Sequence, residues 1–230
     1  MKTKNNTEKK AACFSKIFVA MCLFSLMLAV FSGCRASRGG TIVVKEHLSD
    51  VVLTINDTEF TLEDIGYYIA NGEASVEAQA KIYSPDNTYA YWQKHTNGVF
   101  IKLQAKDNVI DNFTRDIILS MAAKDNGMSL SEEELTYCKT SAKQLFDGLN
   151  DFQKEEAGIT VENLTKAVEN AYLAQLYVNS KLENDNSEGY TAEDWALNGV
   201  CYKGLLSKYE VKVNEDVWEK VDLGKVTIKR

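Results

Sequence analysis

The side chains best suited to covalent or metal chemistry are few and scattered in this sequence. It has two histidines, His47 and His95, and two cysteines beyond its first 34 residues, Cys138 and Cys201. A thiolate nucleophile needs a nearby imidazole base, but nothing in the spacing pairs a histidine with a cysteine. The sequence has no Gly-rich phosphate loop and no GxSxG, HExxH or CxxC motif. We therefore predict no catalytic, cofactor-binding or metal-binding residues, and the sequence does not favour an enzyme.

Two further groups could carry chemistry, but each has a simpler interpretation. Residues 132–134 are three consecutive glutamates. Consecutive residues point around a helix rather than at one cation, and a helix N-terminus favours acids in any case. Cys138 falls in phase with the apolar positions of a predicted helix, which favours a buried thiol. A disulfide with Cys201 is the alternative that an oxidising compartment would allow.

The start of the chain has the pattern of an export signal. Five lysines precede an uncharged run over 17–31, which is shorter than the ~20 residues of a spanning helix. The tetrad at 31–34, FSGC, resembles the lipobox of bacterial lipoproteins, although Phe31 stands where that family usually has Leu. The resemblance implies a signal peptide over 1–33, a lipid on Cys34 and a tether over 34–40. An uncleaved signal anchor and an ordinary signal peptide are the alternatives.

Charge restricts the partners of the exported part. Removal of residues 1–33 takes away five lysines and one glutamate, which leaves 21 basic and 32 acidic residues, a net charge of −11. A chain this acidic disfavours nucleic acid and does not lie flat on anionic lipid. We expect it on the outer face of the bacterial cytoplasmic membrane, held there through its lipid anchor.

The first half of the exported part begins with predicted strands. Runs rich in β-branched residues predict strands at 42–44 and 51–55, the second followed by an Asn-Asp turn and a strand edge at 58–60. Thr61 is a plausible N-cap for a helix that runs toward Asn71-Gly72, and a second helical piece is expected over 75–83. Pro85 then breaks the chain.

Three long helices follow in the predicted order. The first runs from Phe100 to the Asn-Gly pair at 126–127, the second from the capping box at Ser131 to Gly158, and the third from Thr160 to the polar stretch 183–189. Leu145, Val168 and Ala171 are expected on their apolar faces. A final helix over 192–206, an edge strand over 209–213 and a packed tail carrying Trp218, Val221 and Leu223 complete the chain.

These elements predict a mainly α (α+β) fold. Long antiparallel helices would form an arm or cradle, and the N-terminal hairpin and a C-terminal strand would form a small antiparallel sheet.

Three segments in this order resemble the N-terminal chaperone domain of the SurA and PrsA family of exported foldases. They are VLTINDTEFT at 52–61, AAKDNGMSLSEEE at 122–134 and GIT at 158–160. Asp57 stands where the family's turn has Gly, and Asp also tolerates positive φ. The similarity covers roughly 51–182 and implies one chaperone domain over 41–230, with a helical arm at about 61–182 and a C-terminal helix and strand at about 191–230.

The family's isomerase activity does not carry over to this chain. Only 48 residues follow Leu182, too few for a parvulin domain, and both histidines lie upstream. The resemblance implies a membrane-anchored, extracytoplasmic chaperone that binds unfolded or newly exported polypeptides without ATP. A non-catalytic adaptor for one folded partner and a divergent peptidyl-prolyl isomerase homologue are the alternatives. An aromatic-rich zone over 67–92 suits extended clients, although core packing explains each aromatic residue singly.

Overall fold

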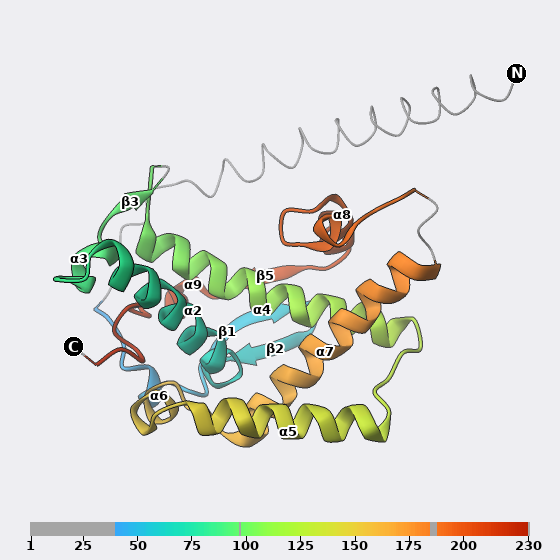
Figure 1. Cartoon of the computed structure of the whole chain (residues 1–230), viewed down its shortest axis with the longest axis horizontal. Coiled ribbons are helices and arrows are strands. Elements are labelled where there is room, and N and C mark those ends of the chain that lie inside the picture. Colours follow the sequence, from blue (N-terminus) through green and yellow to red (C-terminus); the bar gives the residue numbers. More distant parts are fainter. Residues whose placement is uncertain (1–39, 97, 185–187, 230) are drawn as a thin grey trace, which may run out of the picture. The chain divides into compact units, whose positions relative to one another are not determined.

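A computed structural model describes residues 40–96, 98–184 and 188–229 (Figure 1). The predicted signal peptide, Cys34 and all of the tether except Gly40 lie outside the described residues. The predicted fold class is confirmed, because the described chain is mainly helical and carries a small antiparallel sheet. None of its described helices is both long enough and apolar enough to cross a bilayer.

The sheet joins the two ends of the described chain. The central strand β1 (Val51–Ile55) pairs antiparallel with β2 (Thr58–Thr61) on one side and with β5 (Val211–Val213) on the other. The predicted hairpin and the predicted edge strand are therefore confirmed. The strand expected at 42–44 is wrong, because the chain forms the 3-10 helix η1 (Val44–Glu46) there. Just before it, the Ile42 N–H donates to the carbonyl of Lys220.

In the hairpin turn the residue with positive φ is Asn56. The resemblance to the SurA and PrsA family had suggested the next residue, Asp57, which stands where that family has Gly. Asn56 has a φ of 52°, and Asp57 is not in the left-handed region. The Asn56 N–H donates to the Glu210 carbonyl, and its side-chain oxygen accepts from the Glu210 N–H at 2.9 Å. Because these two bonds lead the chain into β5, Asn56 closes the turn and also fixes the third strand.

The first long helix is continuous, contrary to the predicted break at Asn71-Gly72. Helix α2 spans Leu62–Tyr83 and begins with the capping box predicted at Thr61. A Cβ on Gly72 would lie 2.8 Å from the Val109 side chain, on the long helix that packs beside α2. The glycine therefore allows two helices to approach closely, and this packing offsets its poor helix propensity.

The short elements α3 (Thr88–Trp92), β3 (His95–Thr96) and β4 (Val99–Phe100) follow α2 and lead into the second long helix. Helices α4 (Ile101–Asp125) and α7 (Val161–Asn184) agree with the prediction, whereas the helix expected from Ser131 to Gly158 is divided. It consists of α5 (Glu132–Gly148) and α6 (Asp151–Glu156), because Asn150 forms a new capping box with Gln153.

The helix predicted over 192–206 is also divided. It forms the 3-10 helix η2 (Ala192–Trp195) and the short helix α8 (Val200–Leu206). The turn between them brings Gly199 against the backbone of Asp194, where a Cβ would lie 2.2 Å from the carbonyl oxygen. Helix α9 (Glu215–Trp218) follows β5 and begins the C-terminal tail.

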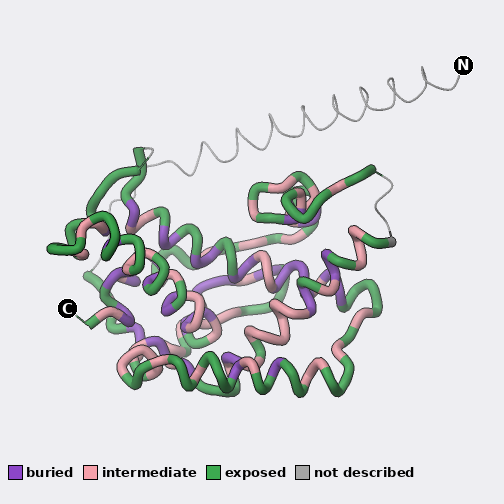
Figure 2. Tube along the Cα trace, in the orientation of Figure 1, coloured by how far each residue is buried: buried purple, intermediate pink, exposed green. Residues whose placement is uncertain are grey.

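The hydrophobic core lies between the sheet and the long helices. Buried positions concentrate in β1, along one side of α2 and α7 and in α4, where residues 117–120 are all buried, whereas α5 is largely exposed (Figure 2). Trp218, Val221 and Leu223 of the tail are buried in the same core, as predicted.

Candidate binding groove

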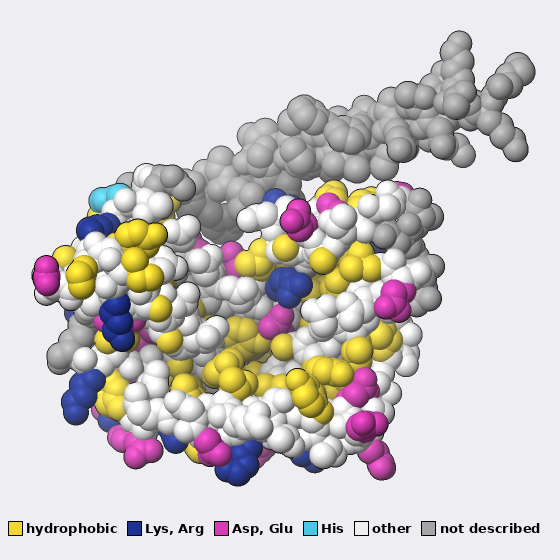
Figure 3. Space-filling model, viewed as in Figure 1, with side chains coloured by type: hydrophobic (Ala, Val, Ile, Leu, Met, Phe, Trp, Pro, Cys, Tyr) yellow, Lys and Arg dark blue, Asp and Glu magenta, His cyan; other side chains and the backbone are white. Residues whose placement is uncertain are grey.

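Four long helices surround a groove of about 640 Å³. In the space-filling view the molecule is hollowed between these helices, and hydrophobic side chains form the floor of the hollow (Figure 3). Helices α2, α4, α5 and α7 each contribute side chains to it. The volume falls in the range of ligand sites, so the groove is the candidate functional site.

Helical spacing explains how each helix reaches the groove. On α4 the groove is lined by Asn108, Asn112 and Asp116, which follow one another at intervals of four residues. Residues with this spacing share one face of a helix. The other three helices show the same spacing of four residues. The positions are Tyr68, Gly72 and Val76 on α2, Tyr137, Ser141 and Leu145 on α5, and Val168 and Tyr172 on α7.

Tyrosines supply the aromatic surface of the groove. Tyr137 and Tyr172 bring α5 and α7 together with ring centroids 5.6 Å apart, and Tyr137 is 58% exposed. On the opposite side the rings of Tyr67 and Tyr68 meet edge to face at 6.2 Å. Tyrosine combines a large apolar ring with a hydroxyl, so these side chains can pack against a bound group and also hydrogen-bond to it.

A chain of hydrogen bonds forms one part of the groove wall. The hydroxyl of Tyr68 donates to Asp116 at 2.9 Å, and Arg115 donates to the other carboxylate oxygen at 3.2 Å. Arg115 also donates to the Trp195 carbonyl, which connects the groove to η2. Burial raises the pKa of Asp116, although the bonds from Tyr68 and Arg115 oppose this shift. Burial, followed by the Asp116 charge, raises the pKa of Tyr68, which keeps its hydroxyl protonated.

The remaining polar lining is uncharged. Carboxamide side chains come from α2, α4 and α7, and Asp116 is the one charged side chain among the described residues that line the groove. Amides both donate and accept hydrogen bonds, as peptide groups do. The groove can therefore hold apolar and amide-bearing groups, while its lining offers no paired nucleophile and base.

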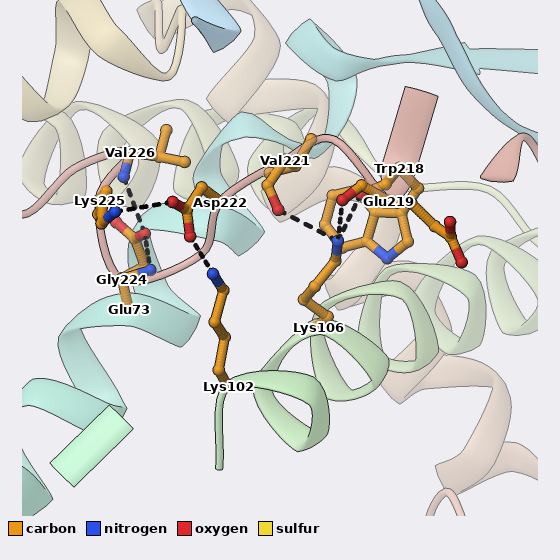
Figure 4. A network of polar contacts seen from close by, with 10 residues as sticks. All are labelled: Glu73, Lys102, Lys106, Trp218, Glu219, Val221, Asp222, Gly224, Lys225 and Val226. Atoms are coloured by element: carbon orange, nitrogen blue, oxygen red, sulfur yellow. Dashed lines mark hydrogen bonds and ion pairs between the residues drawn. The ribbon is translucent and has the colours of Figure 1, made fainter. Parts of the chain in front are cut away.

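The outer side of α2 and α4 is held by the C-terminal tail (Figure 4). Glu73 of α2 accepts from the backbone N–H groups of Gly224, Val226 and Thr227, and Lys106 of α4 donates to three tail carbonyls. Because buried charges require such partners, these contacts fix the two helices from behind while their other faces line the groove.

The histidines and cysteines considered in the sequence as reactive or metal-binding residues do not line the groove. His47 bonds to Asp50 at 2.9 Å, and His95 packs on Phe100 in the β3–β4 hairpin. Cys138 is buried and free, as interpreted, and Cys201 is partly exposed and free, so the alternative disulfide is not present. No group of three or more potential metal ligands occurs within the described ranges. Cys34 lies outside them.

The aromatic-rich zone predicted over 67–92 is divided between several roles. Tyr67 and Tyr68 line the groove. Tyr83 and Tyr91 stack on each other at 6.1 Å outside it, and Trp92 is buried in the core. The zone therefore contributes two of its aromatic side chains to the candidate site rather than a continuous aromatic surface.

Sequence reasoning missed most of the groove. Tyr137, Tyr172 and Asp116 were not predicted as site residues, and Leu145, Val168 and Ala171 line the groove although their phase indicated helix packing. The polar series at 108, 112 and 116 follows one side of the helix at helical spacing. It lies beside the buried apolar positions and not in place of them, so the sequence does not distinguish it from an ordinary exposed side.

No family model, curated protein or solved structure matches the chain. The resemblance to the SurA and PrsA foldases therefore stays a prediction from the sequence.

Proposed function

We propose that this protein is a membrane-anchored extracytoplasmic chaperone that holds unfolded or newly exported polypeptides in the groove without ATP. In this proposal a lipid on Cys34 keeps the protein at the outer face of the bacterial cytoplasmic membrane. The observation that supports it best is the open groove, whose floor is apolar and aromatic and whose polar lining consists largely of amides and hydroxyls.

An unfolded polypeptide presents two kinds of surface at once. Its apolar side chains are stabilised when they are buried away from water. Its backbone N–H and C=O groups need hydrogen-bond partners wherever water is removed. The tyrosines at 67, 68, 137 and 172 meet the first need, and amides such as Asn108 and Asn112 meet the second. Neither contact depends on one client sequence.

Release without an energy source requires weak binding. Each hydrogen bond contributes little net free energy in water, and ordering a flexible chain opposes binding. The acidic surface of the exported part keeps the chaperone itself soluble. Clients would therefore bind reversibly and leave the groove when they fold.

The first experiment follows aggregation of a chemically unfolded, proline-containing client with and without the soluble chain 35–230. We expect the chain to suppress aggregation. Ser75→Trp should weaken the effect, because Ser75 is exposed on the groove wall and the indole would occupy the groove. Ala74→Trp is the matched control, since Ala74 is exposed on the same helix but does not line the groove.

Refolding of the same client distinguishes the alternative functions. An unchanged proline-limited rate together with suppressed aggregation would agree with a holdase, whereas a faster rate would indicate a divergent isomerase. Unchanged aggregation, combined with crosslinking to one folded partner, would reject the chaperone in favour of the adaptor. Equal activity of the Ser75→Trp and Ala74→Trp variants would place client binding outside the groove.

A further inference from the structure

A second group of exposed apolar side chains lies apart from the residues that line the groove. Ile82 and Tyr83, at the end of α2, are 72% and 67% exposed. Tyr89 of α3 and Val99 and Phe100 of β4 are also exposed. We call these five residues the apolar patch. In Figure 3 hydrophobic side chains gather at the end of the molecule that carries α3, beside basic side chains.

Three segments that are distant in sequence meet at this end. The Ile42 N–H donates to the Lys220 carbonyl, which joins the start of the described chain to the tail. The tail then reaches the patch, where the Lys225 ammonium lies 5.9 Å from the centre of the Tyr89 ring. Asp222 pairs with Lys102 at the start of α4. We call residues 40–44, 81–96, 98–102 and 220–229 together the tip.

The tip differs in charge from the rest of the protein. It contains six lysines and two acidic residues, Asp86 and Asp222, whereas residues 34–230 as a whole carry 21 basic and 32 acidic residues. Asp222 pairs with Lys102 and Lys225. Lys45, just after Val44, is not counted because it pairs with Glu155 and Glu156 of α6. Lys81 and Lys94 are exposed beside the apolar patch. The sequence adds Arg35 and Arg38 immediately before the tip and no acidic residue between Cys34 and Lys45.

The predicted lipid anchor ends close to the tip along the chain. Gly40, the first residue of the tip, lies six positions after Cys34. Six residues span at most ~21 Å when fully extended. A lipid on Cys34 would therefore hold Gly40, where the tip begins, within about that distance of the bilayer surface.

We propose that the tip is a contact surface for an anionic phospholipid bilayer. This inference rests on the lipid anchor of the proposed function. Exposed tyrosines and aliphatic side chains suit the membrane–water interface, and lysines near them are attracted to anionic headgroups. The acidic remainder of the chain is repelled by the same headgroups, so the molecule binds by one end. The groove lies on the adjoining helices and stays accessible to clients.

The test uses chain 35–230 with an N-terminal hexahistidine tag on vesicles that contain nickel-chelating lipid. Residues 40–230 form one compact unit that holds the described core, so this chain keeps the folded part. The tag replaces the native anchor, and the result does not depend on lipidation of Cys34 or on client binding. An environment-sensitive fluorophore is attached at Tyr83→Cys, or at Tyr137→Cys as the control, in a Cys201→Ser background. Cys138 is buried and does not label.

We expect doxyl-labelled lipid to quench the label at position 83 but not at position 137, which is exposed outside the tip. Quenching should be strong on phosphatidylglycerol vesicles and weak on pure phosphatidylcholine. Lys81→Glu with Lys94→Glu should abolish it, whereas Lys124→Glu with Lys139→Glu, which makes the same charge change outside the tip, should leave it unchanged. Equal quenching at both label positions, or an equal loss with both lysine pairs, would overturn the proposal.

Discussion

The carboxylate of Glu73 accepts two hydrogen bonds from Thr227, one from the backbone N–H and one from the hydroxyl, both at 2.6 Å. Glu73 is fully buried near the middle of α2, and Thr227 lies 154 residues later in the tail. The same carboxylate also accepts from the N–H groups of Gly224 and Val226. One acidic side chain therefore provides partners for three backbone donors of the tail.

Replacement of Glu73 should destabilise the whole fold. Glu73→Ala removes the buried acceptor of four hydrogen bonds from the tail, and we expect a loss of about 3–5 kcal/mol in the free energy of unfolding. Glu73→Gln should also be harmful, because its amide NH₂ cannot accept from the tail. Urea unfolding followed by circular dichroism measures both effects, with Glu59→Gln on exposed β2 as the control. Native stability in Glu73→Ala would contradict this role.

The pairing of Asp222 with Lys102 and Lys225 should make stability depend on pH. Burial alone would raise the pKa of Asp222, but the hydrogen bonds and charges of the two lysines outweigh it and hold the pKa below 3.8. A carboxyl with a lowered folded-state pKa contributes stability above its unfolded pKa, and this contribution is lost as the pH falls through the folded value.

Asp222→Asn should therefore cost about 2 kcal/mol at pH 7. The difference from the native chain should shrink below pH 3.8, where the unfolded carboxyl is protonated. Unfolding curves at pH 7, 5 and 3 test this. A difference that is constant across the series would mean that the ion pairs do not stabilise the tail.

Two helical glycines should respond to alanine with opposite signs. A Cβ on Gly66 would lie 2.0 Å from the carbonyl oxygen of Ala157, so Gly66→Ala should destabilise the protein by about 3 kcal/mol. Gly204 in α8 has open space around it, and Gly204→Ala should stabilise the protein by about 0.5–1 kcal/mol through helix propensity. Thermal unfolding of both variants checks the pair, and a stabilising Gly66→Ala would show that α2 does not approach Ala157 closely.

The two free thiols should differ in reactivity. Burial, followed by nearby acidic side chains, raises the pKa of both thiols. They differ in access, because Cys138 is fully buried and Cys201 is partly exposed. With a thiol-specific chromophore, chain 35–230 should show one fast group and one slower by on the order of 100-fold, because Cys138 reacts only after local opening. Cys201→Ser should remove the fast phase. A fast phase that survives this change would mean that Cys138 is accessible.

Local sequence determined most of the secondary structure. The capping boxes at Thr61 and Ser131, the hairpin at 51–61 and the helices over 101–125 and 161–184 all follow from residues near one another in the chain. Their signals are caps, turn residues and hydrophobic periodicity, which act over a few positions. The helix boundaries were wrong where a glycine or an asparagine fits either inside a helix or at its end. Gly72 lies inside α2, where a helix end was predicted, and Asn150 begins a new helix, where a continuous helix was predicted.

The tertiary structure decided which helical faces are core and which line the groove. Helical spacing shows on which side of α5 Leu145 lies and on which side of α7 Val168 and Tyr172 lie. It does not show whether a neighbouring helix covers that side. In the structure α2, α4, α5 and α7 leave these faces around an open space, and Asp116 becomes part of its wall. Long-range contacts of this kind depend on side chains more than a hundred residues apart, such as Glu73 and the tail at 224–227, and periodicity within one helix carries no information about them.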